Sequence, residues 1–237
     1  MRDAAIFARM TLASPNEPES TAVLGRPRGR PRKSAKERDD GNRRQALLAT
    51  AAHLFRQQGF DATSTRDIAT AAGMRSGSPF YHFENKQALL AAVMREGMRS
   101  ALERQTTATA ALPAQATPRE RLAALVRNHF EVLLGPDSDF IPVMLYEWRR
   151  LAPAQIGEVT ALKTAYEAAW VPVLASLHAS GQLAGDPVLA RLMIFGALNW
   201  AVQWYQPPAA REGRGRRRAT LDDLTTTALH LFLKDPA

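Results

Sequence analysis

The chain has 237 residues, 46% of them hydrophobic, which is enough to build the core of one large domain or of two modest ones. It contains no cysteine, and this excludes disulfides, thiolate catalysis and cysteine metal sites. The 31 Lys and Arg residues outnumber the 23 Asp and Glu residues, and the resulting charge of +8 favours a polyanionic partner, either nucleic acid or acidic lipid. No stretch approaches the roughly 20 apolar residues of a membrane span, so we expect a cytoplasmic protein without a membrane partner.

Residues 1–41 are rich in Pro, Ser, Glu and Arg and show no hydrophobic periodicity, so we expect them to form a disordered basic arm. Residues 26–44 hold nine basic residues against three acidic ones. Within this stretch the run PRGRP resembles the core of an AT-hook, in which Gly29 lets an extended backbone carry Arg28 and Arg30 into the narrow minor groove of A·T-rich DNA. The alternative is a basic arm that contacts phosphates without sequence preference.

Directly after the arm, apolar residues recur at helical spacing and predict a helix that ends at Gly59. The apolar stripe consists of Leu47, Leu48, Ala51, Leu54 and Phe55. Ser64 fits the N-cap of a second helix at 65–72, and Asp67, three residues later, completes a capping-box pattern.

The next feature is a sharp turn, permitted by Gly73, that leads into a third short helix at about 76–82. The small side chains of Ala69 and Ala72 let the second and third helices approach closely. A bracing helix, a tight turn and an exposed second helix are the parts of a helix-turn-helix unit, whose second helix reads the major groove of DNA. The pattern therefore indicates a DNA-binding unit.

Residues on and around the third helix are the candidates for DNA contacts. Its small side chains can touch bases or phosphates, and Tyr81 can stack on sugars or bond a phosphate. His82 and Lys86 are expected to meet backbone phosphates, while ordinary core packing is the alternative for Tyr81 and His82. The expected DNA-binding residues are Arg28, Arg30, Arg43, Ser64, Thr65, Arg75, Ser76, Gly77, Ser78, Tyr81, His82 and Lys86.

The rest of the chain is also predicted to be helical. Asn85 is expected to cap a long helix, and the expected helices lie at about 86–108, 118–134, 140–151, 154–181, 186–205 and 220–234. Pro172 should kink the helix at 154–181, and Pro207 and Pro208 should stop the helix at 186–205. No stretch sustains the alternation of apolar and polar residues that marks a strand, so the expected fold class is all-α, without a sheet.

The helix-turn-helix segment resembles the DNA-binding domain of TetR-type (tetracycline-repressor family) transcription regulators. The matching residues are Phe55, Gly59, the helix start at 64–68, Ile68, Ala69, Ala72, Gly73 and the run GSPFYHFENKQALL. After the basic arm at 1–41, the resemblance implies a DNA-binding domain at 42–90 and a helical ligand-binding and dimerisation domain at 91–237. Phe80 stands where the family usually has a tyrosine that bonds phosphate, and Pro79 where it has an aliphatic residue, so the recognition contacts should differ in detail.

The implied ligand-binding domain carries all four tryptophans and two aromatic-rich segments, LYEWRRL and FGALNWAVQWY. Trp200 and Trp204 are one helical turn apart, where they would form either a pocket wall for a partly apolar ligand or a plain helical core. Both segments resemble a TetR subgroup that responds to acyl-CoA thioesters, which implies an acyl-CoA effector. His129 and Arg149 are candidates to meet an anionic group, with a solvated or salt-bridged role as the alternative. The expected ligand-binding residues are His129, Tyr146, Arg149, Trp170, Trp200 and Trp204.

The sequence contains no recognisable catalytic constellation. Its five histidines are scattered, and zinc-protease, phosphate-loop, nucleophile-elbow and dinucleotide motifs are missing. We therefore expect no enzyme activity, no cofactor and no metal.

The function that the sequence favours is a homodimeric repressor that binds a double-stranded DNA operator and responds to a small-molecule effector. When bound to DNA it would be associated with the nucleoid. The helices at 186–205 and 220–234 from two chains would form the dimer interface. Two alternatives remain open, namely an enzyme that carries a DNA-binding head and an architectural DNA-binding protein led by the basic arm. The missing acid–base cluster argues against the enzyme.

Overall fold

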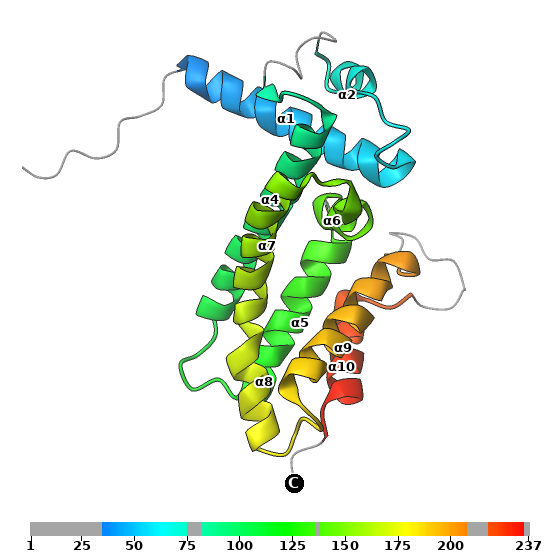
Figure 1. The fold of residues 1–237 in the computed structure, drawn as a ribbon. Helices are drawn as coiled ribbons and strands as arrows, with labels where there is room; N and C mark the ends of the chain where they lie inside the picture. The colour runs from blue at the N-terminus through cyan, green and yellow to red at the C-terminus, as the bar shows by residue number, and fades with distance from the viewer. Residues whose placement is uncertain (1–34, 75–81, 136–137, 208–217, 235–237) are drawn as a thin grey trace, which may run out of the picture.

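The computed structural model describes residues 35–74, 82–135, 138–207 and 218–234, and in these residues the fold is helical (Figure 1). The only β-type pairing among them is an isolated bridge between Leu183 and Leu233. The helices are α1 (Ala35–Gln58), α2 (Thr65–Ala71), α4 (Lys86–Ala110), α5 (Pro118–Leu134), α6 (Phe140–Glu147), α7 (Pro153–Ala168), α8 (Trp170–Ala179), α9 (Pro187–Trp200) and α10 (Leu221–Phe232), with short 3₁₀ turns at Trp148–Arg150 and Ala201–Gln203. The predicted all-α fold class is thus confirmed for the part of the chain that the structure describes.

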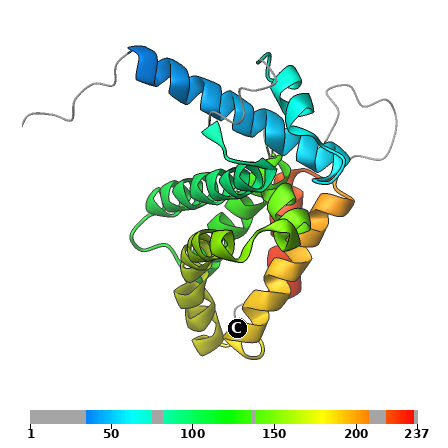
Figure 2. The same cartoon turned by 45° about the horizontal axis from the view of Figure 1, so that its top comes forward.

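The N-terminal head consists of α1, α2 and the first turns of α4. Helix α1 lies across one end of the molecule with α2 beside it, and the remaining helices extend away from them (Figures 1 and 2). The predicted apolar stripe of α1 is buried at Leu47, Leu48 and Phe55, where it packs with Leu89 and Leu90 of α4 in one cluster. Burying this stripe joins the head to the top of the helical body.

Helix α1 begins at Ala35, well before the predicted start. Residues 35–41, which were expected to belong to the disordered arm, are therefore helical. Residues 35–41 include helix formers such as Ala, Lys, Glu and Arg but no apolar stripe, so hydrophobic periodicity could not reveal this part of the helix. The helix predicted at 76–82 lies outside the described residues, apart from His82.

Two turns and two caps in the head agree with the prediction. Gly59 and Gly73 have φ of 81° and 67°, a conformation that glycine adopts without a steric penalty. The Ser64 hydroxyl accepts the backbone N–H of Asp67 at 3.1 Å, and the Asp67 carboxylate accepts the Ser64 N–H at 3.0 Å, which completes the predicted capping box. The Ser64 hydroxyl also donates to the Asp67 carboxylate at 2.6 Å, and this hydrogen bond, followed by the one from the Ser64 backbone N–H, lowers the pKa of Asp67. The Asn85 side chain accepts the Ala88 N–H at 2.8 Å and caps α4.

The body is a bundle in which α4 contacts α5, α6 and α7, while α8, α9 and α10 gather around α5 (Figure 1). Its lower part has a core of its own, to which Leu125, Leu174 and Leu198 contribute. Among the helices that the structure describes, none has both the length and the apolar character needed to cross a membrane.

The predicted helix at 154–181 is two helices, α7 and α8, with a break at Ala169. Pro172 has no N–H to donate to the carbonyl of Ala168, so the helical ladder is interrupted where the kink was expected. Ala169 keeps helical dihedral angles (φ −66°, ψ −23°), and α8 continues in the general direction of α7 (Figure 1). Helix α5 spans the predicted 118–134, with its start fixed by the capping box of Thr117 and Glu120.

Candidate DNA-binding surface and effector cavity

The described part of the head carries some of the residues that were expected to contact DNA. Arg43 lies exposed on α1, Ser64 is the exposed N-cap of α2, and Thr65 is the half-buried first residue of that helix. The His82 ring is half-buried, with its centre 6.4 Å from that of the Phe83 ring. The remaining candidates lie outside the described residues, namely Arg28, Arg30, Arg75, Ser76, Gly77, Ser78 and Tyr81.

Lys86 was expected to contact a DNA phosphate, but its side chain bonds to the protein backbone. Its ammonium donates to the carbonyls of Phe60 and Thr63 at 2.8 and 2.9 Å and lies 4.2 Å from the centre of the Phe60 ring. The turn after α1 leaves these carbonyls without helical partners, and the ammonium satisfies them. Lys86 therefore joins the start of α4 to the turn between α1 and α2, inside the head.

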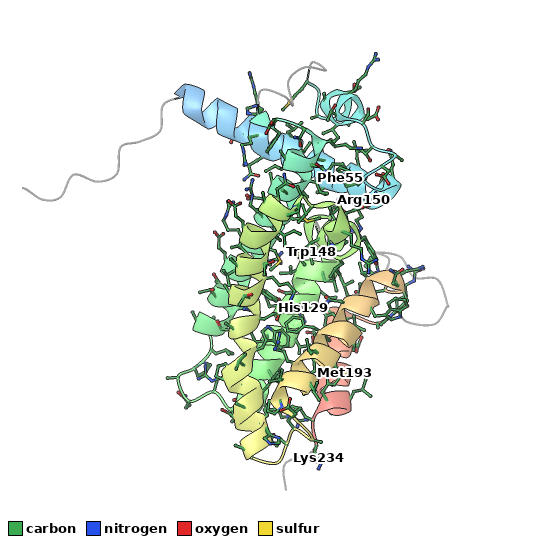
Figure 3. All side chains as sticks on the ribbon, in the orientation of Figure 1. Phe55, His129, Trp148, Arg150, Met193 and Lys234 are labelled. Atoms are coloured by element: carbon green, nitrogen blue, oxygen red, sulfur yellow. The ribbon has the colours of Figure 1, made fainter. Side chains whose placement is uncertain are left out.

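The body contains a cavity of about 150 Å³ beneath the head, between α4, α5, α6, α7 and α9. Most of its wall is apolar, and His129 lies among these helices in the middle of the bundle (Figure 3). The lining residues are Met98, Ala101, His129, Val132, Ile141, Met144, Leu145, Lys163, Tyr166, Glu167, Arg191, Leu192, Phe195 and Asn199. Of the six predicted ligand-binding residues, His129 is the one in this lining.

A neutral polar group forms one side of the cavity. The Nε2 atom of His129 lies 3.0 Å from Oδ1 of Asn199, and its Nδ1 atom lies 3.1 Å from the hydroxyl of Tyr166. Because the amide oxygen can only accept, Nε2 carries the proton and Nδ1 accepts from the Tyr166 hydroxyl. Burial lowers the pKa of His129 to about 4, against the opposing effect of the Asn199 hydrogen bond, and burial also raises the pKa of Tyr166. Near neutral pH this wall therefore offers hydrogen bonds without a net charge.

Trp170 supports the polar wall from behind. Its side chain is fully buried, its ring stands edge-on to His129 at 6.0 Å, and its indole N–H donates to Gln105 at 2.9 Å. The Phe195 ring, which does line the cavity, packs against Trp170 with 4.7 Å between ring centres. Trp170 thus holds His129 and Phe195 in position without being part of the lining.

Three charged side chains also line the cavity, and together we call them the charged edge: Lys163 and Glu167 of α7 and Arg191 of α9. One carboxylate oxygen of Glu167 pairs with Lys163 and the other with Arg191. Glu167 and Arg191 are mostly buried, with 17% and 19% of their side-chain surface exposed. Two cations share one anion, so the charged edge has a net positive charge.

Helix α6 connects the cavity to the head. Ile141, Met144 and Leu145 of α6 line the cavity. Just before α6 begins, the Asp139 carboxylate accepts a hydrogen bond of 2.7 Å from the Arg56 guanidinium of α1. Its other oxygen lies 2.9 Å from Nδ1 of His53.

The far end of α6 is tied to the head as well. The Glu147 carboxylate accepts the backbone N–H of Phe60 at 2.9 Å, and the neighbouring Arg150 pairs with Asp61. Both ends of a helix that lines the cavity are therefore bonded to α1 or to the turn that follows it.

The other predicted ligand residues lie away from this cavity. The Tyr146 hydroxyl accepts a hydrogen bond from Gln203, and Arg149 is exposed in the 3₁₀ turn after α6. Trp200 and Trp204 are 65% and 55% exposed. Their spacing suggested one shared helix face, but α9 ends at Trp200, and the apolar face that includes Trp200 points outward.

Sequence reasoning missed most of the polar lining. Lys163 and Glu167, and likewise Phe195 and Asn199, are four residues apart on a helix, the same spacing that drew attention to the tryptophans. Nothing in the sequence indicates which of these pairs faces inward. Among the residues that the structure describes, no three His, Asp or Glu side chains are grouped to hold a metal ion.

The outer face of α9 is apolar, and its large side chains are not buried by other parts of the chain that the structure describes. Met193, labelled in Figure 3, is 72% exposed, and Leu231 of α10 is 76% exposed. The large exposed apolar residues of α9 are Val188, Leu189, Leu192, Met193 and Trp200. They recur at helical spacing and so form a continuous stripe, of the kind that marks an interaction surface.

Comparisons with known proteins agree with this architecture. Residues 47–93 match the family model of bacterial regulatory proteins of the tetR family, and residues 115–231 match that of the tetracyclin repressor-like C-terminal domain. The HTH-type transcriptional repressor KstR2 of Rhodococcus jostii is 30% identical over 171 residues, which cover 70% of this chain and 80% of the relative. The chain therefore belongs to the TetR family, and this relative is a transcriptional repressor.

Solved structures show the same fold along most of the chain. The superantigen PfiT is 36% identical, with a TM-score of 0.65 over 81% of this chain and 97% of that one. AibR in complex with isovaleryl coenzyme A and operator DNA is 25% identical, with a TM-score of 0.69 over 80% of this chain and 97% of that one.

Proposed function

We propose that this TetR-family protein is a repressor that binds a double-stranded DNA operator as a homodimer and leaves it when a small molecule occupies the cavity. The observation that carries the proposal is that α4 extends from the head into the cavity wall and that α6, which lines the cavity, is bonded to the head. Helix α4 places Leu89 and Leu90 in the core of the head and Met98 and Ala101 in the wall of the cavity. As a bacterial DNA-binding regulator it would act in the cytoplasm, on the nucleoid.

The proposed dimer forms through the apolar stripe of α9 together with α10. In a two-fold dimer the same patch meets itself, so an exposed apolar stripe on one helix can be buried by its own copy. Such a pairing would cover Leu189, Met193 and Trp200, and it would bring two heads to one face of the DNA. Heads spaced by roughly 34–36 Å reach successive turns of the major groove.

The proposed effector is an acyl-CoA or a related acyl compound. AibR binds isovaleryl coenzyme A, and the cavity of this chain offers an apolar wall, a neutral polar group and a positive edge. A ligand that fits between Met144 of α6 and His129 of α5 would shift α6, whose two ends are bonded to the head at Asp139 and Glu147. It would release DNA to the extent that it binds better to the form whose heads do not fit the operator.

The test begins with the operator, which can be selected from a random library of DNA duplexes by repeated binding to the purified protein. Fluorescence anisotropy then measures the affinity for the selected duplex and its release by isovaleryl-CoA. We expect one enriched, two-fold symmetric sequence and saturable release without turnover of the thioester. If no sequence is enriched, the protein is an architectural DNA-binding protein, and if the thioester is consumed, it is an enzyme.

A further inference from the structure

The charged edge points to the chemical class of the effector. We propose that the effector is a compact apolar group joined to an anionic head, and that this anion replaces the Glu167 carboxylate on Arg191 and Lys163. The inference rests on the proposed function, because it concerns the same cavity. It goes further by naming the ligand's size and charge and the contact that the ligand breaks.

The size of the cavity limits the apolar group. A dry cavity of about 150 Å³ accommodates a molecule of the size of benzene, and this cavity has that volume. An aromatic ring or a short branched chain therefore fits between Met98, Met144 and Phe195, whereas a long acyl chain does not. The bulk of any coenzyme A ester would have to lie outside the body.

The neutral polar wall cannot satisfy an anion by charge. His129 and Tyr166 are both uncharged near neutral pH and already bond to each other. The side-chain amide of Asn199 also carries N–H donors, which suit a carbonyl oxygen next to the apolar group. An anionic group on the same ligand is therefore directed to the cations of the charged edge, Arg191 and Lys163.

Glu167 already occupies the place that such an anion needs. It pairs with Lys163 on its own helix and with Arg191 on α9, so it holds α7 and α9 together beside the cavity. A ligand carboxylate or phosphate can take both cations, because guanidinium groups bind either oxyanion through paired hydrogen bonds. The exchange would remove an ion pair between α7 and α9 without leaving Arg191 unpaired.

The experiment is calorimetric titration of the full chain with four probes: isovalerate, its uncharged analogue isovaleramide, isovaleryl-CoA and coenzyme A alone. We expect at least one of the two anionic acyl probes to bind and isovaleramide to bind at least about tenfold more weakly. Binding of isovalerate assigns the anion to a carboxylate, while binding of the thioester alone assigns it to the coenzyme phosphates. Equal binding of isovaleramide, or no binding of either anionic acyl probe, would overturn the inference.

Variants separate an anion site from a structural ion pair. Glu167→Gln removes the competing carboxylate and should raise the affinity for the anionic probe by about tenfold, whereas Arg191→Gln should lower it by a similar factor. Glu158→Gln is the matched control. It breaks another ion pair between helices, the one between Glu158 of α7 and Arg95 of α4, and neither residue lines the cavity. It should leave the affinity unchanged.

The outcome that contradicts the inference is weaker binding in Glu167→Gln as well as in Arg191→Gln. Lys163→Gln provides a second reading if Arg191→Gln does not fold, since the Lys163 side chain is half exposed and tolerant of change. Operator binding and release by isovaleryl-CoA are measured on the same variants. If isovaleryl-CoA still releases the operator equally well from Glu167→Gln, Arg191→Gln and Lys163→Gln, the proposed function stands. In that case only the exchange of the Glu167 carboxylate for a ligand anion is rejected.

Discussion

At the scale of single residues, His129 shows how burial decides the chemistry of the cavity. An imidazole in water is half protonated near pH 6.5, but inside this bundle its pKa falls to about 4 because the charged form loses its hydration. The ring is therefore a hydrogen-bonding group between Tyr166 and Asn199, and it does not supply a cation for an anionic ligand.

This burial makes stability depend on pH. Between pH 6.5 and 4 the unfolded chain binds a proton at His129 that the folded chain does not, so this contribution to stability is complete above pH 6.5 and is lost as the pH falls towards 4. At about 1.4 kcal/mol per pH unit, the free energy of unfolding should drop by about 2 kcal/mol at pH 5. Urea unfolding of the wild type and of His129→Gln at pH 7.5 and pH 5, at one protein concentration, isolates this residue. Parallel losses in both proteins would contradict the assignment.

Lys86 makes a second prediction at this scale. Lys86→Met keeps the aliphatic stem over the Phe60 ring but leaves two carbonyls without their donor, so the head should lose about 1–3 kcal/mol of stability in urea unfolding. The salt dependence of operator binding should stay the same, because the ammonium already has partners within the protein. The neighbouring exposed substitution Glu84→Met is the control and should cost little. A salt slope lower by about one unit would instead restore the phosphate contact that the sequence suggested.

At the scale of elements, the sequence predicted what local chemistry determines. Residues 118–134 and the capping box at Ser64 are specified by caps, proline and apolar spacing, and the structure confirms both. The start of α1 at Ala35 was not predicted, and near Ala169 the predicted kink is a break between two helices. The first is set by polar helix formers that leave no hydrophobic pattern, and the second depends on how two helices pack once Pro172 has interrupted them.

The candidate site was less predictable than the fold. Helical spacing identifies residues that share a face but not which face turns inward, because that depends on the neighbouring helices. His129 was predicted correctly as a residue of the lining. Trp200 was predicted there too, but it lies on the outer face of α9, and the preceding residue, Asn199, lines the cavity instead. A rotation of about 100° between consecutive helical residues separates these two environments.

The bonds between α6 and α1 give a prediction for this pair of elements. Asp139→Asn keeps the size of the side chain but removes the charge that pairs with Arg56, so movement of α6 should be passed less effectively to the head. We expect operator binding to persist and the concentration of isovaleryl-CoA needed for half release to rise severalfold in anisotropy titrations. Glu131→Gln, which breaks an ion pair with Arg127 on α5, is the control. Identical release curves for the wild type and Asp139→Asn would show that the bond between Asp139 and Arg56 does not transmit ligand binding to the head.

At the scale of the whole molecule, the outer stripe of α9 should determine the assembly. Met193→Glu places a charge in the middle of this stripe, where burial against a second copy would leave it unpaired. We expect sedimentation to show a monomer and operator affinity to fall with it, with or without effector. Val171→Glu changes a similarly exposed apolar residue on α8 and should remain a dimer. If Met193→Glu still sediments as a dimer, the dimer interface lies on another surface.

Helix α9 turns Phe195 and Asn199 towards the cavity and Met193 and Trp200 towards the outside. A mutation that adapts one side to a new ligand shifts the backbone that carries the other side, so changes here are subject to two kinds of selection at once. Helix α7 also lines the cavity, but among the described residues it has no large exposed apolar side chain on its outer face. New ligand preferences should therefore arise during evolution through residues of α7 such as Lys163, while α9 changes slowly.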